Sequence, residues 1–329
     1  MNLTEVQAEE SASEPILEPE LSIVDPHLHQ WPTGSFIPYD SSAVSADLER
    51  GHNIEATVFV ECSASYRTGG EPALRPVGET EFVVAEHPPT SSIRIAAGIV
   101  GWVDLTHPET VGQVLDAHLE VGGDRFCGLR DIVAWRPDDT HAGGRPVIPH
   151  VMTTEAYRQS LREVSARHLT FDVWLFHDQL PELCGVLDEM PDLRVVVDHL
   201  GGPVARAGTT DAFDDWRGDL AEVAKRPNVV LKVGGLGMPA SRTLPVTTGR
   251  PESMAVAAAW RPYVETAVEL FGSNRCMFES NFPIDKQTVS YDALWNSFKI
   301  ITSGWSPDER LELFEATARQ TYTLPGIRN

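Results

Sequence analysis

Basic side chains are scarce in this sequence of 329 residues, in which 26 Lys and Arg face 48 Asp and Glu for a formal net charge of −22. A strongly acidic surface repels phosphate backbones, so we expect no nucleic-acid partner. The sequence also lacks an apolar run long enough for a membrane span, so we expect no membrane partner. Its four cysteines lie far apart without a C-x-x-C pair, which favours buried thiols in a reducing compartment.

The beginning of the chain lacks basic residues altogether. Residues 1–20 contain six Glu and no Lys or Arg, which is the opposite of a signal peptide with its basic start and apolar centre. We therefore expect a cytoplasmic protein. We also expect residues 1–20 to form a flexible acidic tail and residues 21–329 to form a single domain.

Apolar runs alternate with helical patterns along the rest of the chain, and 42% of the residues are hydrophobic. Runs typical of buried parallel strands lie at residues 22–29, 55–62, 94–104, 126–133, 170–177, 193–199, 229–233 and 275–283. Segments with helical periodicity or capping signals lie at residues 41–50, 78–87, 108–121, 154–167, 181–190, 213–225, 254–271, 291–302 and 307–322. The longer loops, at residues 63–76, 134–153 and 238–254, are expected to carry substrate specificity.

Eight strand–helix units without a linker predict an α/β fold of the (β/α)8 TIM-barrel type in a single domain. The alternative is a doubly wound open sheet, which usually shows a glycine-rich phosphate-binding turn after its first strand. Here the first strand ends in His-Leu-His-Gln-Trp-Pro, which cannot form such a turn. The barrel is therefore the favoured fold.

The first predicted strand ends in a His-x-His pair, His27 and His29. Residues two apart on a strand point the same way and lie about 7 Å apart along it, so both rings could face one metal ion or one substrate. In a TIM barrel the chemistry lies at the C-terminal ends of the strands. Other polar residues at predicted strand ends are Glu61, Arg130, Asp131, His177, Asp198, His199, Lys232, Glu279 and Asn281. Four histidines at three strand ends predict one shared site.

Five stretches resemble the amidohydrolase superfamily and occur in the same order along the chain. They are residues 24–31 (VDPHLHQW), 128–130 (GLR), 174–177 (WLFH), 197–203 (VDHLGGP) and 278–283 (FESNFP). The chain is most similar to the amidohydrolase-2 type of TIM-barrel hydrolase. Within that type it resembles the lactonase-like branch, which includes sugar-acid lactonases and 2-pyrone-4,6-dicarboxylate lactonase.

This resemblance implies that His27, His29 and His177 are metal ligands and that His199 is the sixth-strand histidine of the site. Strand four carries no lysine, so the resemblance implies a mononuclear centre of zinc or manganese without a carbamylated lysine. The lactonase branch is thought to include metal-independent enzymes, so a site without a metal is the alternative.

Asn281 departs from the family, which places an aspartate at this position as a metal ligand and as the base that activates water. An amide cannot take a proton from water. Three interpretations follow. Glu279, on the same face, replaces the carboxylate; or His27, His29 or His199 acts as the base without a metal; or the barrel has lost the usual hydrolysis.

The leading hypothesis is a hydrolase that opens a lactone, or a related cyclic ester or amide, of a small organic acid. Arg130, Lys232 and Glu61 are the predicted substrate-binding residues, because cationic side chains hold carboxylates. Further candidates for binding a carboxylate are Arg67, Arg136 and Arg145, while Asp285 and Lys286 are expected at the rim or in a structural ion pair. The alternatives are a non-oxidative decarboxylase of a carboxylated aromatic or unsaturated acid, and a non-catalytic ligand-binding barrel. The expected partner is a small anionic molecule, and a homo-oligomer is compatible with the sequence.

Overall fold

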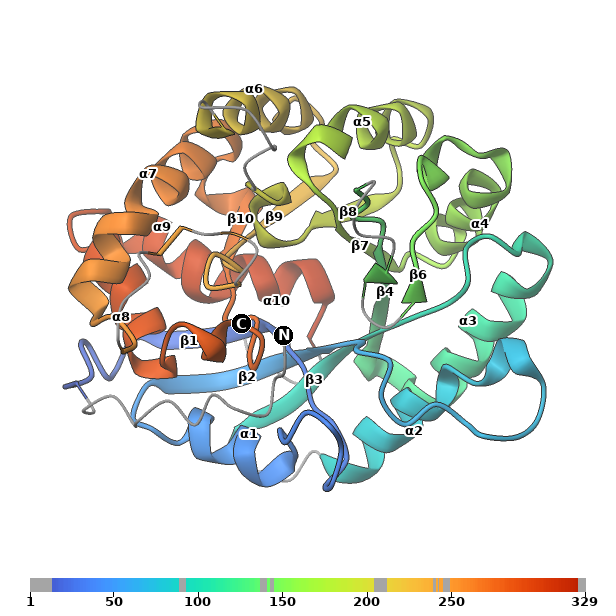
Figure 1. The fold of residues 1–329 in the computed structure, drawn as a ribbon, viewed down its shortest axis with the longest axis horizontal. Helices are drawn as coiled ribbons and strands as arrows, with labels where there is room; N and C mark the ends of the chain where they lie inside the picture. Colours follow the sequence, from blue (N-terminus) through green and yellow to red (C-terminus); the bar gives the residue numbers. More distant parts are fainter. Residues whose placement is uncertain are drawn as a thin grey trace.

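Eight parallel strands lie side by side at the centre of the computed structural model (Figure 1). They are paired in the order in which they occur along the chain: β1 (Ser22–Leu28), β2 (Asn53–Val60), β3 (Arg94–Gly101), β4 (Phe126–Ile132), β7 (Thr170–Trp174), β8 (Arg194–Val197), β9 (Val229–Val233) and β10 (Cys276–Phe278). A short antiparallel pair, β5 (His141–Ala142) and β6 (Arg145–Pro146), follows β4. The structure describes residues 14–88, 93–136, 141–142, 145–203, 212–238, 241, 243–244 and 249–324.

The first and last strands come together and nearly close the sheet into a barrel. Leu28 forms a parallel bridge with Phe282, and the backbone N–H of His29 donates to the carbonyl of Phe282 at 2.8 Å. One step away, the N–H of Asn281 donates to the carbonyl of His27 at 3.0 Å. The predicted (β/α)8 fold is therefore confirmed, and its closure places Asn281 beside the first-strand histidines.

Helices form an outer ring around the strands (Figure 1). They are α1 (Ser41–Leu48), α2 (Val77–Glu86), α3 (Pro108–Gly122), α4 (Glu155–Ala166), α5 (Leu180–Glu189), α6 (Ala212–Ala224), α7 (Ser253–Phe271), α8 (Tyr291–Ile301), α9 (Pro307–Leu311) and α10 (Thr317–Tyr322). Side-chain caps start several of them: the Thr154 hydroxyl accepts a hydrogen bond from the N–H of Tyr157 at the start of α4. Asp40 caps α1 in the same way.

Two apolar clusters hold the barrel together. The larger one lies between the strands and the ring of helices and includes the buried rings of Trp216, Trp260 and Trp295. The smaller one joins strand residues to α10, and its members include Val24, Val58, Val60, Val100, Val196, Met277 and Tyr322. Branched side chains of this size fill the interior of a TIM barrel, so the centre of the barrel is a packed core rather than a pore.

Several predicted boundaries need correction. The fifth strand ends at Trp174, so His177 lies beyond it in the short 3₁₀ helix η4 (His177–Gln179). The last strand covers only Cys276–Phe278, so the polar residues after it lie on the loop. The helix predicted at 307–322 is divided into α9 and α10 by a π-helical turn, Glu312–Ala316. Helix α7, in contrast, continues through Pro262.

The chain packs against the barrel before residue 21, earlier than expected. Asn296 of α8 accepts from the N–H of Leu17 and donates to the carbonyl of Pro15, both at 2.9 Å. Lys299 donates to the carbonyls of Leu17 and Glu18. The predicted tail of residues 1–20 is therefore too long by at least residues 15–18, and residues 1–13 lie outside the described part of the chain.

Two other expectations are only partly covered by the structure. The predicted loop at 134–153 contains the β5–β6 pair and a short 3₁₀ helix. The predicted loop at 238–254 falls partly outside the described residues, at 239–240, 242 and 245–248. Among the helices that are described, none is both long enough and apolar enough to cross a membrane.

Candidate active site

His27, near the end of β1, and His29, directly after it, face each other through their Nε2 atoms, which lie 3.2 Å apart. His29 Nδ1 lies 2.8 Å from the carbonyl oxygen of Val60 and so must carry the proton that it donates. The Nε2 atom of His29 therefore presents a lone pair to His27. The strand end is held in place by Asp25, whose Oδ1 accepts from the N–H of Ser280 after β10 at 3.0 Å.

Glu279 joins the first-strand pair to the histidine after β8. Its Oε2 lies 2.9 Å from His27 Nδ1, and its Oε1 lies 2.6 Å from His199 Nδ1. Oε1 also accepts from the backbone N–H of His199 at 3.2 Å. Burial by itself would raise the pKa of the Glu279 carboxyl, but His199 and His27 together lower it to about 2. Glu279 is therefore an ionised acceptor held between two imidazoles.

The histidine after β8 has little freedom to move. His199 has a φ of 53° and lies in the 3₁₀ helix η5 (His199–Gly201), with its ring 4.9 Å from that of Trp174. Gly235 packs against its other side, where a Cβ would fall 2.5 Å from the Cβ of His199. The glycine after β9 is thus required for the backbone to approach the ring.

Lys232 lies fully buried inside the barrel rather than facing a substrate. Its Nζ is 2.8 Å from Asp172, 3.0 Å from Asp198 and 3.2 Å from His27 Nδ1. Burial lowers its pKa, but the two carboxylates outweigh burial and raise it above its usual value. Lys232 therefore stays protonated beneath His27, and its predicted role in binding a substrate carboxylate is replaced by a structural and electrostatic one.

Arg130 and Glu61 form a buried ion pair that also includes Arg145. Arg130 Nε lies 2.8 Å from Glu61 Oε1, and its Nη2 donates to the Glu61 carbonyl at 2.6 Å. Arg145 approaches both oxygens of the same carboxylate, at 2.8 and 2.9 Å. Burial opposes ionisation of Glu61, but the two guanidinium groups lower its pKa to about 2. Arg130 also lies 3.9 Å from Asp198, so two carboxylates balance the two guanidinium groups of this ion-pair cluster.

Glu79 lies close to this ion-pair cluster, and its pKa is raised to about 8 by burial and by the charge of Glu61. Its Oε1 accepts from the N–H groups of Cys62 and Ala64, at 3.0 and 2.7 Å. The folded protein therefore binds this proton more tightly than the unfolded chain does. Stability contributed by the protonated form is lost as the pH rises from about 4.5 to about 8.

Replacing Glu79 by Gln is expected to remove this loss of stability at rising pH. The free energy of unfolding of Glu79→Gln relative to the wild type should increase between pH 5 and pH 8 by at least about 1.4 kcal/mol, the equivalent of one pKa unit. Urea unfolding of both proteins at several pH values measures the difference. Parallel pH profiles would show that Glu79 is ionised in the folded state.

Asn281 is buried and makes its side-chain contact with Asp285, one turn further along the chain. Its Nδ2 lies 2.8 Å from Asp285 Oδ1, and Asp285 Oδ2 accepts from the N–H of Gly237 at 2.8 Å. Burial raises the pKa of Asp285 to about 7, against these hydrogen bonds. Asp285 is thus not a residue of the rim, whereas Lys286 forms an ion pair with Asp47.

The structure does not bring His177 into the histidine cluster. Because the strand ends at Trp174, the side chain of His177 turns to the helix layer, where its Nδ1 lies 3.0 Å from Asp219 of α6. Among the described residues, the group whose ligand atoms lie within 4.8 Å of one another is His27, His199 and Glu279. Of the metal set predicted from the sequence, His27, His29 and His177, the structure brings the first two together and places His177 beside Asp219.

The geometry of His27 and His29 fits one divalent cation. Two nitrogens bound to one zinc ion at about 2.0–2.1 Å lie about 3.3 Å apart in a tetrahedral site, and the two Nε2 atoms lie 3.2 Å apart. Each ring has a partner for its other nitrogen, Val60 for His29 and Glu279 for His27, as metal-bound histidines usually do. Burial, aided by nearby cations, holds the pKa of His27 well below its usual value and lowers that of His29 to about 3, so both rings are neutral.

The Nε2 atoms of His27 and His29 can also be joined by a direct hydrogen bond, without a cation. If Lys232 donates to His27 Nδ1, at 3.2 Å, the proton of His27 moves to Nε2 and is donated to His29. The two alternatives differ in the tautomer of His27: the first lets Nδ1 donate to Glu279, and the second lets Nδ1 accept from Lys232 and leaves Glu279 Oε2 without a proton from His27. The residues therefore fit a metal ion but are also compatible with a site that functions without one.

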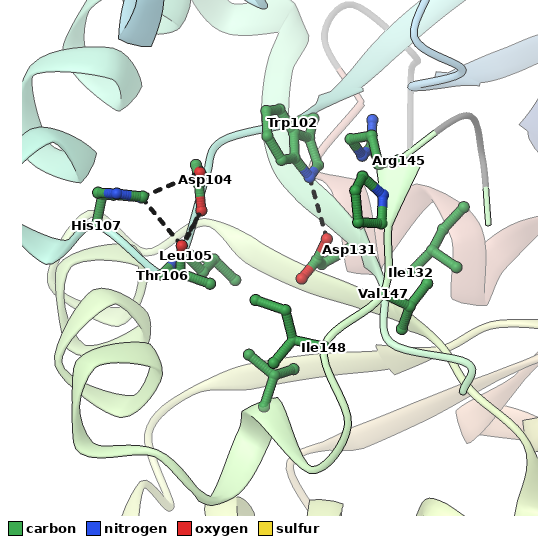
Figure 2. A pocket seen from close by; sticks show the side chains of 12 residues that line it. Trp102, Asp104, Leu105, Thr106, His107, Asp131, Ile132, Arg145, Val147 and Ile148 are labelled. Atoms are coloured by element: carbon green, nitrogen blue, oxygen red, sulfur yellow. Dashed lines mark hydrogen bonds and ion pairs between the residues drawn. The ribbon is translucent and has the colours of Figure 1, made fainter. Parts of the chain in front are cut away.

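A cavity of about 430 Å³ lies next to Arg145, beyond the ends of β3 and β4 (Figure 2). The guanidinium of Arg145 lies over the indole of Trp102, 4.3 Å from its centroid. Asp131 accepts from Trp102 Nε1 at 3.0 Å, and aliphatic side chains such as Ile132 and Ile148 line the remaining wall. Arg145 thus connects this cavity to Glu61 and Arg130.

The remaining candidates predicted from the sequence lie outside the histidine cluster. Two residues of the site had no predicted role. Arg67 pairs with Glu81 at the surface, and Arg136 stacks on Phe176. Asp172 was not among the predicted residues, although a single acidic residue within an apolar strand is a recognisable sign of a buried charge pair. Asp25 likewise lay within the quoted motif without a predicted role.

Comparison with known proteins identifies relatives of this chain. Residues 24–324 match the model of a family described as amidohydrolase. The chain is 32% identical to the uncharacterized protein y4mH of Sinorhizobium fredii, over 93% of this chain and 99% of that protein. It is 26% identical to an L-fucono-1,5-lactonase of Burkholderia ambifaria, over 79% of this chain and 87% of that protein.

A solved structure of similar fold is that of an amidohydrolase from Burkholderia multivorans with bound zinc. The alignment has a TM-score of 0.70 at 23% sequence identity and covers 92% of this chain and 99% of that chain. The lactonase relative agrees with the lactonase-like resemblance found in the sequence. Because the family match extends over nearly the whole barrel, this chain belongs to the amidohydrolase family.

Proposed function

We propose that this protein is a hydrolase that opens the lactone ring of a small hydroxy acid, with His199 as the general base. The observation that carries the proposal is the contact of 2.6 Å between His199 Nδ1 and Glu279. A carboxylate that holds the proton on Nδ1 leaves the lone pair of Nε2 available for a water molecule. The relationship to an L-fucono-1,5-lactonase supports a sugar-acid lactone as the substrate class.

These contacts support the following reaction. As water attacks the lactone carbonyl, its proton passes to His199 Nε2, and the ionised Glu279 stabilises the resulting imidazolium. When the ring C–O bond breaks, His199 returns the proton to the departing alkoxide oxygen. Arg130 places a positive charge at the same end of the barrel, where negative charge develops on the carbonyl oxygen.

His27 and His29 are the residues that would hold a divalent ion, with Glu279 and His199 close to them. A bound ion would polarise the carbonyl and lower the pKa of a water molecule. The cavity beside Trp102 and Arg145 is the proposed place for the part of the substrate that does not react.

A panel of five- and six-membered sugar-acid lactones, including L-fucono-1,5-lactone, tests the proposal in water enriched in ¹⁸O. The expected result is ring opening with one ¹⁸O atom in the new carboxylate. Carboxylated aromatic acids form the second panel, with CO₂ as the measured product. Release of CO₂ from these acids without turnover of any lactone would replace the hydrolase proposal by a decarboxylase.

Elemental analysis of protein purified without added metal is a separate test of the first-strand pair. We expect about one zinc or manganese per chain in the wild type and little in a His27→Ala/His29→Ala variant, because the variant lacks the paired nitrogens. Circular dichroism of the variant should show an intact fold. Equal metal content in both proteins would place the ion elsewhere, and a metal-free active wild type would show that His199 works without one.

A further inference from the structure

Asn281 occupies the position at which resembling hydrolases carry an aspartate, and its side chain is fixed. The residue has a φ of 53°, a conformation in which Asn is more readily accommodated than most residues. Its backbone N–H donates to the carbonyl of His27 at 3.0 Å, so it lies directly beside the histidine pair. The residue is 1% exposed, so bulk solvent cannot serve both ends of its amide group and each end needs a specific partner.

Asp285 determines which end of the Asn281 amide, the NH₂ group or the carbonyl oxygen, can face it. An ionised carboxylate only accepts hydrogen bonds. Its Oδ2 accepts from the backbone N–H of Gly237, which cannot turn away, and its Oδ1 lies 2.8 Å from the amide nitrogen of Asn281. The backbone N–H of Asp285 donates in turn to the carbonyl of Asn281 at 3.1 Å. A Cβ on Gly237 would fall 2.8 Å from Oδ2, so the close approach depends on glycine.

The amide orientation has a direct chemical consequence. Because the NH₂ group of Asn281 is directed to Asp285, the amide oxygen is turned away from that carboxylate. We propose that Asp285 is a positioning residue that makes Asn281 present a hydrogen-bond acceptor, rather than a donor, to the histidine cluster. Asn281 then orients a water molecule or a substrate hydroxyl and leaves proton removal to His199. This role in catalysis rests on the proposed hydrolase function, whereas the pairing of the two side chains does not.

The pairing also explains why an amide stands at this position. An aspartate at position 281 would bring a second carboxylate within about 3 Å of Asp285, and two buried carboxylates at that distance cannot both be ionised. Asn281 and Asp285 are therefore a coupled pair, in which one member must be neutral and must donate to the other.

Exchange of the two residues tests the proposal at pH 8.5, above the pKa of Asp285. In Asp285→Asn, the new amide oxygen still accepts from Gly237, so its NH₂ faces Asn281 and forces that amide to turn. In Asn281→Asp, two carboxylates meet. In the double exchange Asn281→Asp/Asp285→Asn, the new amide donates to the carboxylate at 281 and accepts from Gly237, so every hydrogen bond is restored and an oxygen again faces the cluster.

We expect each single variant to lower kcat at least thirtyfold with little change in KM, and the double exchange to recover kcat to within about tenfold of the wild type. A loss of kcat in single variants that are still fully folded under the assay conditions, followed by recovery on exchange, separates positioning from support of the fold. Asp292→Asn on α8, which weakens the ion pair between the buried Asp292 and the exposed Arg50, is the matched control and should lower stability without changing kcat. A single variant Asp285→Asn with unchanged kcat would overturn the positioning role.

Urea unfolding of the same four proteins provides a readout that needs no substrate. Both single variants should unfold at lower urea concentration than the wild type, and the double exchange should unfold at a higher concentration than either single variant. Additive losses would overturn the coupled pair, whatever the reaction proves to be. If the unfolding cycle shows coupling while the wild type opens no lactone, the proposed function fails and the pairing stands.

Discussion

Replacing Glu279 by Gln is expected to lower kcat/KM for lactone hydrolysis by about a thousandfold, which lies within the range for loss of general acid–base catalysis. The carboxylate accepts from both the ring and the backbone of His199 and lies 2.9 Å from His27 Nδ1. Gln has the same shape but only one acceptor oxygen and no charge. It can neither hold the His199 proton on Nδ1 as firmly nor stabilise the imidazolium that forms in the transition state.

The kinetic pattern separates this role from substrate binding. The loss should fall on kcat, with KM changed by less than about threefold, because Glu279 acts through His199 rather than on the substrate. His199→Ala should cause a loss of similar size, and the double variant should be little worse than either single one. A Glu279→Gln enzyme with activity within threefold of the wild type would mean that another group removes the proton.

Sequence patterns predicted the fold and the centre of the site because both depend on local regularity. Alternating apolar runs and helical periods repeat eight times, and a barrel is the arrangement that buries all of them. His27 lies on the first strand and His29 directly follows it, and a spacing of two residues predicts that they point the same way. The structure brings His199 and Glu279 next to this pair, as expected from the prediction that histidines at several strand ends share one site.

The incorrect assignments arose where the chain leaves a regular strand. Alternation places a side chain only while the strand lasts, and the fifth strand stops three residues before His177. The strand pattern predicts Lys232 at the mouth of the barrel, but its side chain is fully buried, and an apolar pattern does not show how far a side chain lies from the strand end. The partnership of Asn281 with Asp285 depends on a turn after β10, which no periodic pattern describes.

Lys232→Met is expected to reduce the free energy of unfolding by about 3–5 kcal/mol, the usual cost of leaving buried charges without their partner. Lys232 is fully buried between Asp172 and Asp198, at 2.8 and 3.0 Å. Met has a similar length and is apolar, so packing inside the barrel changes little while both carboxylates lose their counter-ion. The loss is therefore electrostatic, and it should diminish when one carboxylate is also neutralised.

Urea unfolding of three variants separates the charge effect from packing. Lys232→Met/Asp172→Asn should recover part of the stability lost in Lys232→Met, because one fewer buried charge is left without a partner. The matched control is Lys225→Met, which breaks the exposed ion pair with Glu222 on α6 and should leave the urea midpoint unchanged. Equal loss in the single and double Lys232 variants would show that the lysine contributes through its packing alone. Recovery in the double variant would show that the cation beneath His27 is also what allows two carboxylates to stay buried inside the barrel.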